Sequence, residues 1–237
     1  MAIKLIDFDN LAKTLTFCIY IMGYTDTEKS RMEFIEYINH TYSARNIHRL
    51  LEEITKRINA NILNITEYDY DPYGASVNIL TSDLSVSNGE TLAHLDKSHI
   101  SVHTYPEIDK ISNVRIDLEI STCGNISPLN ALSLVADMFN PDVLIYDFVI
   151  RGVTKNRKGK RIYTCNDYKK SIKDYNRTQT DRYHIIKKHK YRDHGVEVNM
   201  LKRRNKYSDY IDSEQIMNHE KNDKVYKEAK RIFLRRR

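Results

Sequence analysis

The chain has 237 residues, of which 41 % are hydrophobic and few are Gly or Pro, which indicates a packed globular protein rather than a disordered one. The formal net charge of +6 is uneven, because residues 151–237 carry +16 and residues 1–150 carry −10. A basic half can bind nucleic acid. No DNA- or RNA-binding motif accompanies this charge, so the sequence does not favour a nucleic-acid partner over a solvated or intramolecular role for the basic half.

The sequence also bounds the location of the protein. No apolar run approaches the roughly 20 residues that span a bilayer, and the first residues, "MAIKLIDFDN", lack the pattern of a signal peptide. The three cysteines, Cys18, Cys123 and Cys165, are far apart in the chain and suit reduced thiols. We therefore expect a cytoplasmic protein with no membrane association.

Taken in chain order, the predicted elements begin with helices and continue with strands. Residues 28–39 and 43–58 have apolar residues at helical spacing. The period then changes, and residues 60–66, 74–82, 98–105 and 113–122 are predicted to be strands. In 113–122, Val114, Ile116 and Leu118 alternate with polar residues, and Cys123 continues the polar face.

The second half of the chain is predicted less completely. Ser127 and Pro128 open a helix over 127–139 as N-cap and first helical residue, and a strand follows over 142–152. "KVYKEAKRIFLRRR" (224–237) reads as a C-terminal helix, and the polar region before it has no assigned structure. Up to about residue 165, interleaved helices and strands predict an α/β or α+β layered architecture.

The segment "AHLDKSHISVHTYPE" (93–107) concentrates groups that handle protons around one serine. His99 and His103 share a strand face and could bind zinc with Glu107 or Cys123, but His-x₃-His on a strand is a weak signal and no metal site is predicted. A Ser-His-acid hydrolase usually presents its serine in a G-x-S-x-G turn, which is missing here. Either histidine alone is most simply an ordinary hydrogen-bonded residue.

A self-cleaving serine fits the segment better. The Ser98 hydroxyl could attack the carbonyl of the Lys97–Ser98 peptide bond and form an ester, provided that nearby groups take the proton and stabilise the oxyanion. β-Elimination would then cut the chain, and loss of ammonia would leave a pyruvoyl group at the new terminus. Such a group is an electrophile that can form a Schiff base with a substrate amine.

Several segments in order resemble the S-adenosylmethionine decarboxylase proenzyme family, in its longer, enterobacterial type. The most telling are "PYGAS" (72–76), "DKSHISVHTYPE" (96–107) and "STCGNISPLNAL" (121–132). The likeness extends to "NLAKTLTFCIY" (10–20), "NANILNI" (59–65) and "IRGVT" (150–154). It covers residues 1–165 well and the basic tail, residues 166–237, only loosely.

The resemblance implies a role for each matching residue. Lys97–Ser98 matches the cleavage site, so that Ser98 would become the pyruvoyl group. His103 matches the histidine that promotes processing, and Ser76 a serine that assists the same step. Cys123 matches the general acid that protonates the substrate.

Two further residues match positions that contact the substrate. Glu107 matches the acid of the H-T-[WY]-P-E run, with a binding or supporting role, and Tyr70 an aromatic residue that stacks on adenine.

The resemblance also implies the whole molecule. Its fold would be α+β, a two-layer α/β sandwich with an antiparallel sheet, here extended by a basic helical C-terminal region. Residues 1–237 would form a single domain, cut into a β chain (1–97) and an α chain (98–237). The activity would be pyruvoyl-dependent decarboxylation of S-adenosylmethionine for spermidine synthesis, in a homo-oligomer of α/β pairs, with stimulation by Mg²⁺.

Two alternatives remain open from the sequence. The same pyruvoyl chemistry could act on ornithine or arginine, because homologues differ in the pocket around Tyr70. Alternatively, the chain could be an unprocessed nucleic-acid-binding or regulatory homologue that uses its basic tail, although the intact set Ser76, Lys97, Ser98, His103 and Cys123 counts against this.

Overall fold

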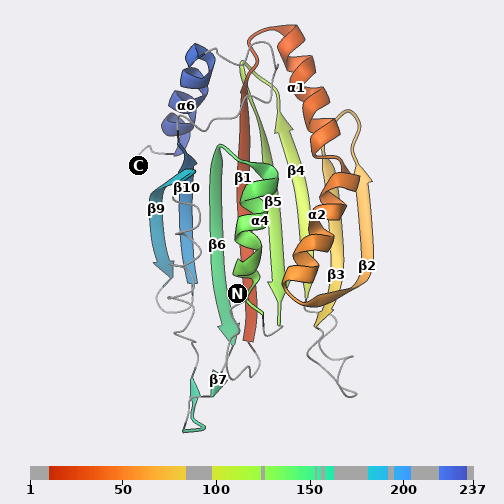
Figure 1. Ribbon diagram of the computed structural model, residues 1–237, viewed down its shortest axis with the longest axis vertical. Helices are drawn as coiled ribbons and strands as arrows, with labels where there is room; N and C mark the ends of the chain where they lie inside the picture. Colours follow the sequence, from red (N-terminus) through yellow and green to blue (C-terminus); the bar gives the residue numbers. More distant parts are fainter. Residues whose placement is uncertain are drawn as a thin grey trace.

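A computed structural model describes residues 11–83, 98–123, 126–152, 154–155, 158–162, 181–191, 195–203 and 219–233. The described chain is organised around one eight-stranded sheet with the strand order β2-β3-β4-β5-β1-β6-β10-β9 (Figure 1). Every neighbouring pair in this sheet is antiparallel. The expected antiparallel α+β architecture is therefore confirmed.

The strands run over the following residues: β1 Leu11–Tyr24, β2 Ala60–Asp69, β3 Ala75–Asp83, β4 His99–Glu107, β5 Ile111–Thr122, β6 Val143–Gly152, β9 Tyr183–Tyr191 and β10 Gly195–Lys202. Two short strands, β7 (Thr154–Lys155) and β8 (Arg161–Ile162), pair separately. The strands expected within residues 60–152 are all present, with small shifts at their ends.

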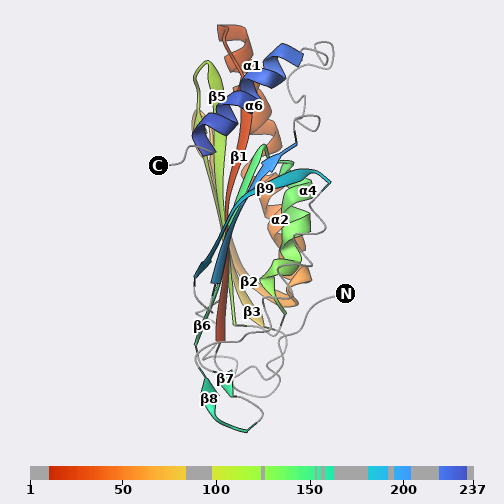
Figure 2. The same cartoon turned by 90° about the vertical axis from the view of Figure 1, so that its left-hand side faces the viewer.

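Helices cover one face of the sheet. Helix α1 (Glu28–Thr41) and helix α2 (Ala44–Arg57) cross β2 to β5, and α4 (Leu132–Phe139), entered through the 3-10 turn η2 (Pro128–Ala131), lies beside them (Figure 2). The Thr27 side chain caps α1 by accepting a hydrogen bond from the Ser30 N–H, and Ser127 accepts from the Leu129 N–H at η2. Ser127 thus acts as the predicted N-cap.

Strand alternation separates a covered face from an open face. On β5, alternate residues are fully buried beneath the helices, among them Ile116, Leu118 and Ile120. The intervening side chains form what we term the open face: Cys18 on β1, Ser76 on β3, His99, Ser101 and His103 on β4, and Asp117, Glu119 and Ser121 on β5. Because successive strand residues point to opposite faces, one sequence pattern supplies both the core and a polar surface.

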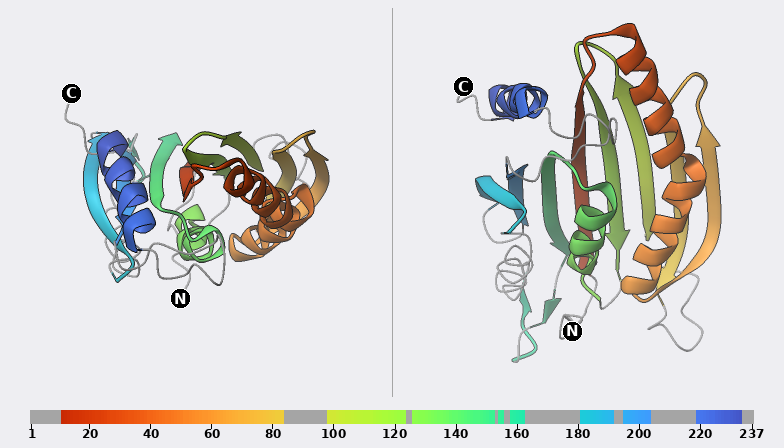
Figure 3. Two further views of the ribbon diagram at one scale, coloured as in Figure 1. Left: turned by 90° about the horizontal axis from the view of Figure 1, so that it is seen from above. Right: turned by 45° about the horizontal axis from the view of Figure 1, so that its top comes forward.

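The C-terminal region adds to this sheet. Strand β10 pairs with β6, β9 pairs with β10, and helix α6 (His219–Phe233) lies across the end of the sheet beside them (Figure 3). Val225 and Ala229 of α6 are buried against Met22, Val143 and Leu201, which stand on the open-face side of their strands. The expected C-terminal helix is confirmed, whereas strands β9 and β10 were not predicted.

Two other sequence expectations need comment. The central strand β1 was not predicted as a strand, although Leu15, Phe17 and Ile19 alternate with polar residues and are fully buried. Cys18 lies half-buried on the open face, because its position in the alternation is that of the polar residues. No helix in the described part of the chain is long and apolar enough to cross a membrane.

Candidate active site

Ser98 lies immediately before β4 and is 4 % exposed. Its carbonyl oxygen accepts a hydrogen bond from the Thr81 N–H at 3.0 Å, and its Oγ accepts one from the Cys123 N–H at 3.4 Å. The first contact comes from β3 and the second from the end of β5, so residue 98 is held from both sides. Lys97 and the segment before it lie outside the described residues.

Cys123 follows β5 and is half-buried. It approaches Ser98 because β4 and β5 are antiparallel and their register ends at the pair His99–Ser121, so that the start of one strand meets the end of the other. The structure therefore brings together the expected pyruvoyl precursor and the expected general acid.

Ser76 and His103 form a second group, further along β4 from Ser98. They are direct partners in the β3–β4 register and both belong to the open face. The Tyr70 hydroxyl lies 3.1 Å from the Ser76 Oγ, and the Tyr70 ring packs edge-on against Tyr68 with centroids 5.0 Å apart. Three expected site residues, Ser76, His103 and Tyr70, thus lie close together.

The turn in "PYGAS" positions Tyr70 beside Ser76. The Tyr70 N–H donates to the Gly74 carbonyl at 2.8 Å, and the Ala75 N–H donates to Thr104 Oγ1 at 2.6 Å. Gly74 has φ +103, and a Cβ there would stand 3.4 Å from the Thr104 carbonyl oxygen. Glycine is favoured at such a backbone conformation, which explains its place in the motif.

The two groups do not meet within one chain. His103 is five residues along β4 from Ser98, which is about 16 Å in a strand. His103 pairs with Asp117, six residues before Cys123 on β5. His103 and Cys123 both continue predicted polar strand faces, but they do not approach one another within a single chain, because the register separates them along the strands.

Glu107 lies at the far end of β4, where its Oε2 accepts a hydrogen bond from Asn113 Nδ2 at 2.8 Å. It is exposed and more distant from Ser98 than His103 is. The expected site residues therefore lie on or beside β4, spread along the length of this strand rather than gathered in one cavity.

Sequence reasoning missed a row of buried polar residues beside Ser98. Thr81 on β3, Thr122 on β5 and Lys13 on β1 are nearly or fully buried on the covered face, and Lys13 pairs with Thr122. The Thr81 Oγ1 has no hydrogen-bond partner among the described residues. The sequence could have revealed this row, because these polar residues occupy strand positions at which the alternation places apolar ones. They make the covered face polar near Ser98.

Cys18 belongs to a different neighbourhood. Burial raises the pKa of its thiol above the usual value, hydrogen bonding with Tyr20 lowers it, and the Asp117 carboxylate raises it further. Cys18 pairs with Asp117, the same residue that pairs with His103 on the other side. Its thiol is therefore a weaker acid than usual and lies on β1, opposite a β5 residue that is six positions before Cys123.

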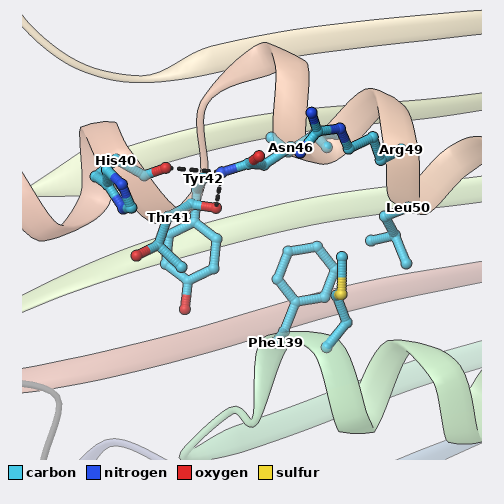
Figure 4. A pocket seen from close by; sticks show the side chains of 9 residues that line it. His40, Thr41, Tyr42, Asn46, Arg49, Leu50 and Phe139 are labelled. Atoms are coloured by element: carbon cyan, nitrogen blue, oxygen red, sulfur yellow. Dashed lines mark hydrogen bonds between the residues drawn. The ribbon is translucent and has the colours of Figure 1, made fainter.

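The helix layer contains a pocket of about 310 Å³ that holds none of the expected site residues. Figure 4 shows it between the α1–α2 turn and α4, with Tyr42, Leu50 and Phe139 on its walls and Asn46 Nδ2 donating to the His40 and Thr41 carbonyls. Within the described residues, no group of three or more His, Cys, Asp or Glu side chains could hold a metal ion.

Comparison with known proteins relates this geometry to a family. Residues 32–152 match the family model described as S-adenosylmethionine decarboxylase. The chain is 37 % identical to the S-adenosylmethionine decarboxylase proenzyme of Pseudomonas syringae pv. syringae, over 98 % of this chain and 95 % of that protein. It is 41 % identical to the proenzyme of Clostridium perfringens, over 73 % of this chain and 71 % of that protein. The chain belongs to the S-adenosylmethionine decarboxylase family.

The family match contains both groups of site residues, because Ser76, Ser98, His103 and Cys123 all fall within residues 32–152. The match to the Pseudomonas syringae protein extends over nearly the whole chain, so it includes most of the basic C-terminal region. Among solved structures, the adenosylmethionine decarboxylase of Aquifex aeolicus is similar with a TM-score of 0.40 at 20 % identity, over 63 % of this chain and 98 % of that chain.

Proposed function

We propose that this member of the S-adenosylmethionine decarboxylase family is a proenzyme that cuts itself between Lys97 and Ser98 and then decarboxylates S-adenosylmethionine. The observation that carries the proposal is the buried Ser98 hydroxyl, which accepts a hydrogen bond from the Cys123 N–H at 3.4 Å. It supports the proposal because a self-cleaving serine needs a fixed hydroxyl that is shielded from water and close to a donor.

Self-cleavage would begin with attack of the Ser98 Oγ on the Lys97 carbonyl carbon. The peptide C–N bond breaks, the hydroxyl proton passes to the Ser98 nitrogen, and an ester links the two residues. Removal of the Ser98 Cα proton then breaks the Cβ–Oγ bond, so that Lys97 leaves as a carboxylate. The Cys123 N–H is placed to stabilise the Ser98 Oγ while it takes the electrons of the breaking bond. Water then replaces nitrogen, which departs as ammonia.

The residue-98 environment fits the resulting pyruvoyl group. Its own carbonyl is fixed by the Thr81 N–H, and its surroundings are buried and polar, with Thr81 and Thr122 on the neighbouring strands. The pyruvoyl group supplies an electrophilic carbonyl that binds the substrate amine and accepts electrons as carbon dioxide leaves. Cys123 is then the proton donor to the substrate α-carbon, since a thiol with a reference pKa of about 8.5 is mostly protonated at neutral pH.

The remaining site residues are proposed to process the chain or bind the substrate. His103 would assist the elimination, and Ser76, held by the Tyr70 hydroxyl, would assist the same step. The Tyr70 ring is 47 % exposed, so it has a free surface on which adenine can stack. Glu107 has a carboxylate oriented by Asn113 and is proposed as a substrate-binding group.

These roles require a homo-oligomer. Because His103 and Ser76 lie about 16 Å along β4 from Ser98, the pair in one chain cannot act on the serine of the same chain without a large rearrangement. Both residues are on the open face, which α6 covers only at one end of the sheet. We propose that His103 and Ser76 of one copy act at Ser98 of a second copy whose open face lies against the first.

The primary test is an intact-mass measurement of the purified protein. We expect two fragments, residues 1–97 and residues 98–237, the larger blocked at its amino terminus by a pyruvoyl group. The Ser98→Ala chain should stay whole and inactive. A wild-type chain that decarboxylates S-adenosylmethionine while remaining whole would overturn the proposal.

Co-expression tests the arrangement between copies. A Ser98→Ala chain and a His103→Ala chain should each remain uncut alone. Together they should cut the His103→Ala chain, because the Ser98→Ala partner supplies an intact His103. If the mixture remains uncut while its two chains co-purify, His103 does not act between copies. Stimulation by Mg²⁺ stays a prediction from the resemblance, checked by assay with and without a chelator.

A further inference from the structure

The histidine next to the cut has no part in the reaction proposed above. His99 is the first residue of β4, and its Nε2 lies 3.0 Å from the Oε1 of Glu119 on β5. Both side chains belong to the open face and are about half-exposed, at 45 % and 40 %. Sequence reasoning assigned His99 no role beyond an ordinary hydrogen bond, and the question is what this bond does.

The pair joins β4 and β5 along a diagonal. His99 is directly opposite Ser121, and Glu119 is directly opposite Ser101, so the two side chains reach across to positions two residues out of line. A diagonal contact changes length when one strand slides past the other. The His99–Glu119 pair therefore resists movement of β4 along β5.

Residue 98 depends on this stretch of β4 for its position. The paired ladder ends at His99 on both sides, with Leu80 of β3 and Ser121 of β5 as its partners. Beyond the ladder, residue 98 has the carbonyl contact with the Thr81 N–H and the Oγ contact with the Cys123 N–H. Self-cleavage makes residue 98 a chain end and removes the Oγ, and chain ends fray unless they are tied down.

We propose that the His99–Glu119 pair is a brace that holds residue 98 against Cys123 once the chain has been cut. The proposal rests on the proposed cut between Lys97 and Ser98. His99 is thus a positioning residue, which acts through the backbone of β4 and does not touch the substrate. Before the cut, the continuous chain restrains residue 98 as well, so the brace matters most in the mature enzyme.

The chain offers a matched control. His48 on α2 and Glu67 on β2 form another histidine–carboxylate contact, with Nδ1 and Oε2 2.8 Å apart and side chains 28 % and 46 % exposed. It has the same chemistry and similar exposure but contacts neither β4 nor residue 98. Glu119→Gln and Glu67→Gln each remove one carboxylate charge from a histidine contact, and only the Glu119 contact involves β4; His48 keeps a second carboxylate, Glu52, whose Oε1 lies 3.6 Å from its Nε2.

The test is amide hydrogen exchange, read by mass spectrometry on the peptide that begins at residue 98. In the cut enzyme, we expect Glu119→Gln to speed exchange of the first β4 amides by about fivefold, the effect expected from losing one half-exposed histidine–carboxylate contact. His99→Gln should do the same, and Glu67→Gln should leave these amides unchanged. In the uncut Ser98→Ala background, which also lacks the Oγ, Glu119→Gln should have a much smaller effect.

A kinetic measurement separates positioning from general stability. Glu119→Gln should lower kcat for S-adenosylmethionine with little change in KM, whereas Glu67→Gln should alter neither. The brace is refuted if the two variants exchange alike, or if Glu119→Gln acts equally in cut and uncut chains. Intact mass of the same samples reports the cut itself. A cut chain without the exchange difference refutes only the brace, whereas an uncut wild-type chain refutes the proposed function and the brace together.

Discussion

The two faces of the sheet are built from the same strands but follow different rules. On the covered face, residues such as Leu118 and Val102 are fully buried beneath the helices, and their identity is determined by packing. On the open face, one residue further along each strand, His103 and Glu119 remain partly exposed, and Ser76 is buried beside the Tyr70 hydroxyl. A single register error in any strand would exchange the two faces. The core therefore also fixes where the reactive side chains point.

The largest expected effect separates the side chain of Cys123 from its backbone. Cys123→Ala should lower the decarboxylation rate by about 10²- to 10⁴-fold, the usual contribution of a general acid. Self-cleavage should persist, because the Cys123 backbone N–H that contacts the Ser98 Oγ is retained. A steady-state assay and intact mass on the same sample measure both. Cys18→Ala, which removes a thiol on the open face, should leave the rate unchanged, and equal losses in the two variants would contradict the assignment.

Substitutions on the covered face should lower the free energy of unfolding. Leu118 is fully buried, so Leu118→Ala should lower the free energy of unfolding by about 2–5 kcal/mol through lost burial and a residual cavity. Ser101→Ala, on the open face of the adjacent strand, should cost less than about 0.5 kcal/mol. Urea unfolding of both variants in the uncut Ser98→Ala background gives the comparison in a single chain. Equal costs would contradict the difference in packing between the two faces of one chain.

An acidic residue buried at the end of the covered face should make stability depend on pH. Burial raises the pKa of Asp142 from 3.8 to about 6, opposed by Lys202 and by the Met22 N–H, which donates to its Oδ2 at 2.6 Å. The folded chain therefore holds this proton more tightly than the unfolded chain. The contribution to stability is greatest below pH 4 and is lost as the pH rises through about 6.

Protonation of Asp142 contributes at most about 3 kcal/mol to the free energy of unfolding, because its pKa rises from 3.8 to about 6 on folding. Urea unfolding between pH 4 and 7 should give a free energy of unfolding that falls with rising pH in the wild type, and this fall should be absent in Asp142→Asn. The same pH slope in both chains would assign the titration to another group. The variant also tests whether Lys202, which donates to the Asn140 carbonyl at 3.1 Å, stays buried without its charged neighbour.

The smallest expected effect concerns one hydroxyl on the open face. Tyr70→Phe removes the contact with Ser76 and keeps the ring, so self-cleavage should slow by up to about tenfold, as expected for one hydrogen bond. KM for S-adenosylmethionine should stay the same, because stacking requires only the ring. Tyr68→Phe is the control, since Tyr68 is an exposed neighbour on the same sheet. A raised KM with normal cleavage would show that the hydroxyl serves the substrate instead.

Much of the fold could be predicted because periodicity is local. The alternation at Val114, Ile116 and Leu118 correctly assigned both faces of β5, and Ser127 with Pro128 marked the start of the 3-10 turn before α4. Strands β9 and β10 could not be predicted in this way. "YHIIKKHKY" in β9 is rich in lysine, and it becomes a strand through pairing with β10, which in turn pairs with β6 some fifty residues earlier in the chain. Such long-range pairing overrides local preference.

The candidate site shows a similar division. The motifs supplied the expected site residues, and the register places Ser98 beside Cys123 and Ser76 beside His103. The motifs could not provide the distance between these two pairs. The alternation of polar and apolar residues gives the face on which His103 and Cys123 lie, but not how far apart they are along the strands. Distance along a strand depends on which residues pair, and pairing is a property of the folded sheet.

The order of strands in the sheet has a consequence for the mature enzyme. A cut after residue 97 assigns β1, β2 and β3 to one polypeptide and β4, β5, β6, β9 and β10 to the other. Because β1 lies between β5 and β6, the two polypeptides interlock within the sheet. They cannot separate without breaking three ladders of hydrogen bonds, those of β3–β4, β5–β1 and β1–β6. Once unfolded, they must find each other by diffusion, so recovery of the native protein should depend on concentration, whereas the uncut precursor can fold on its own.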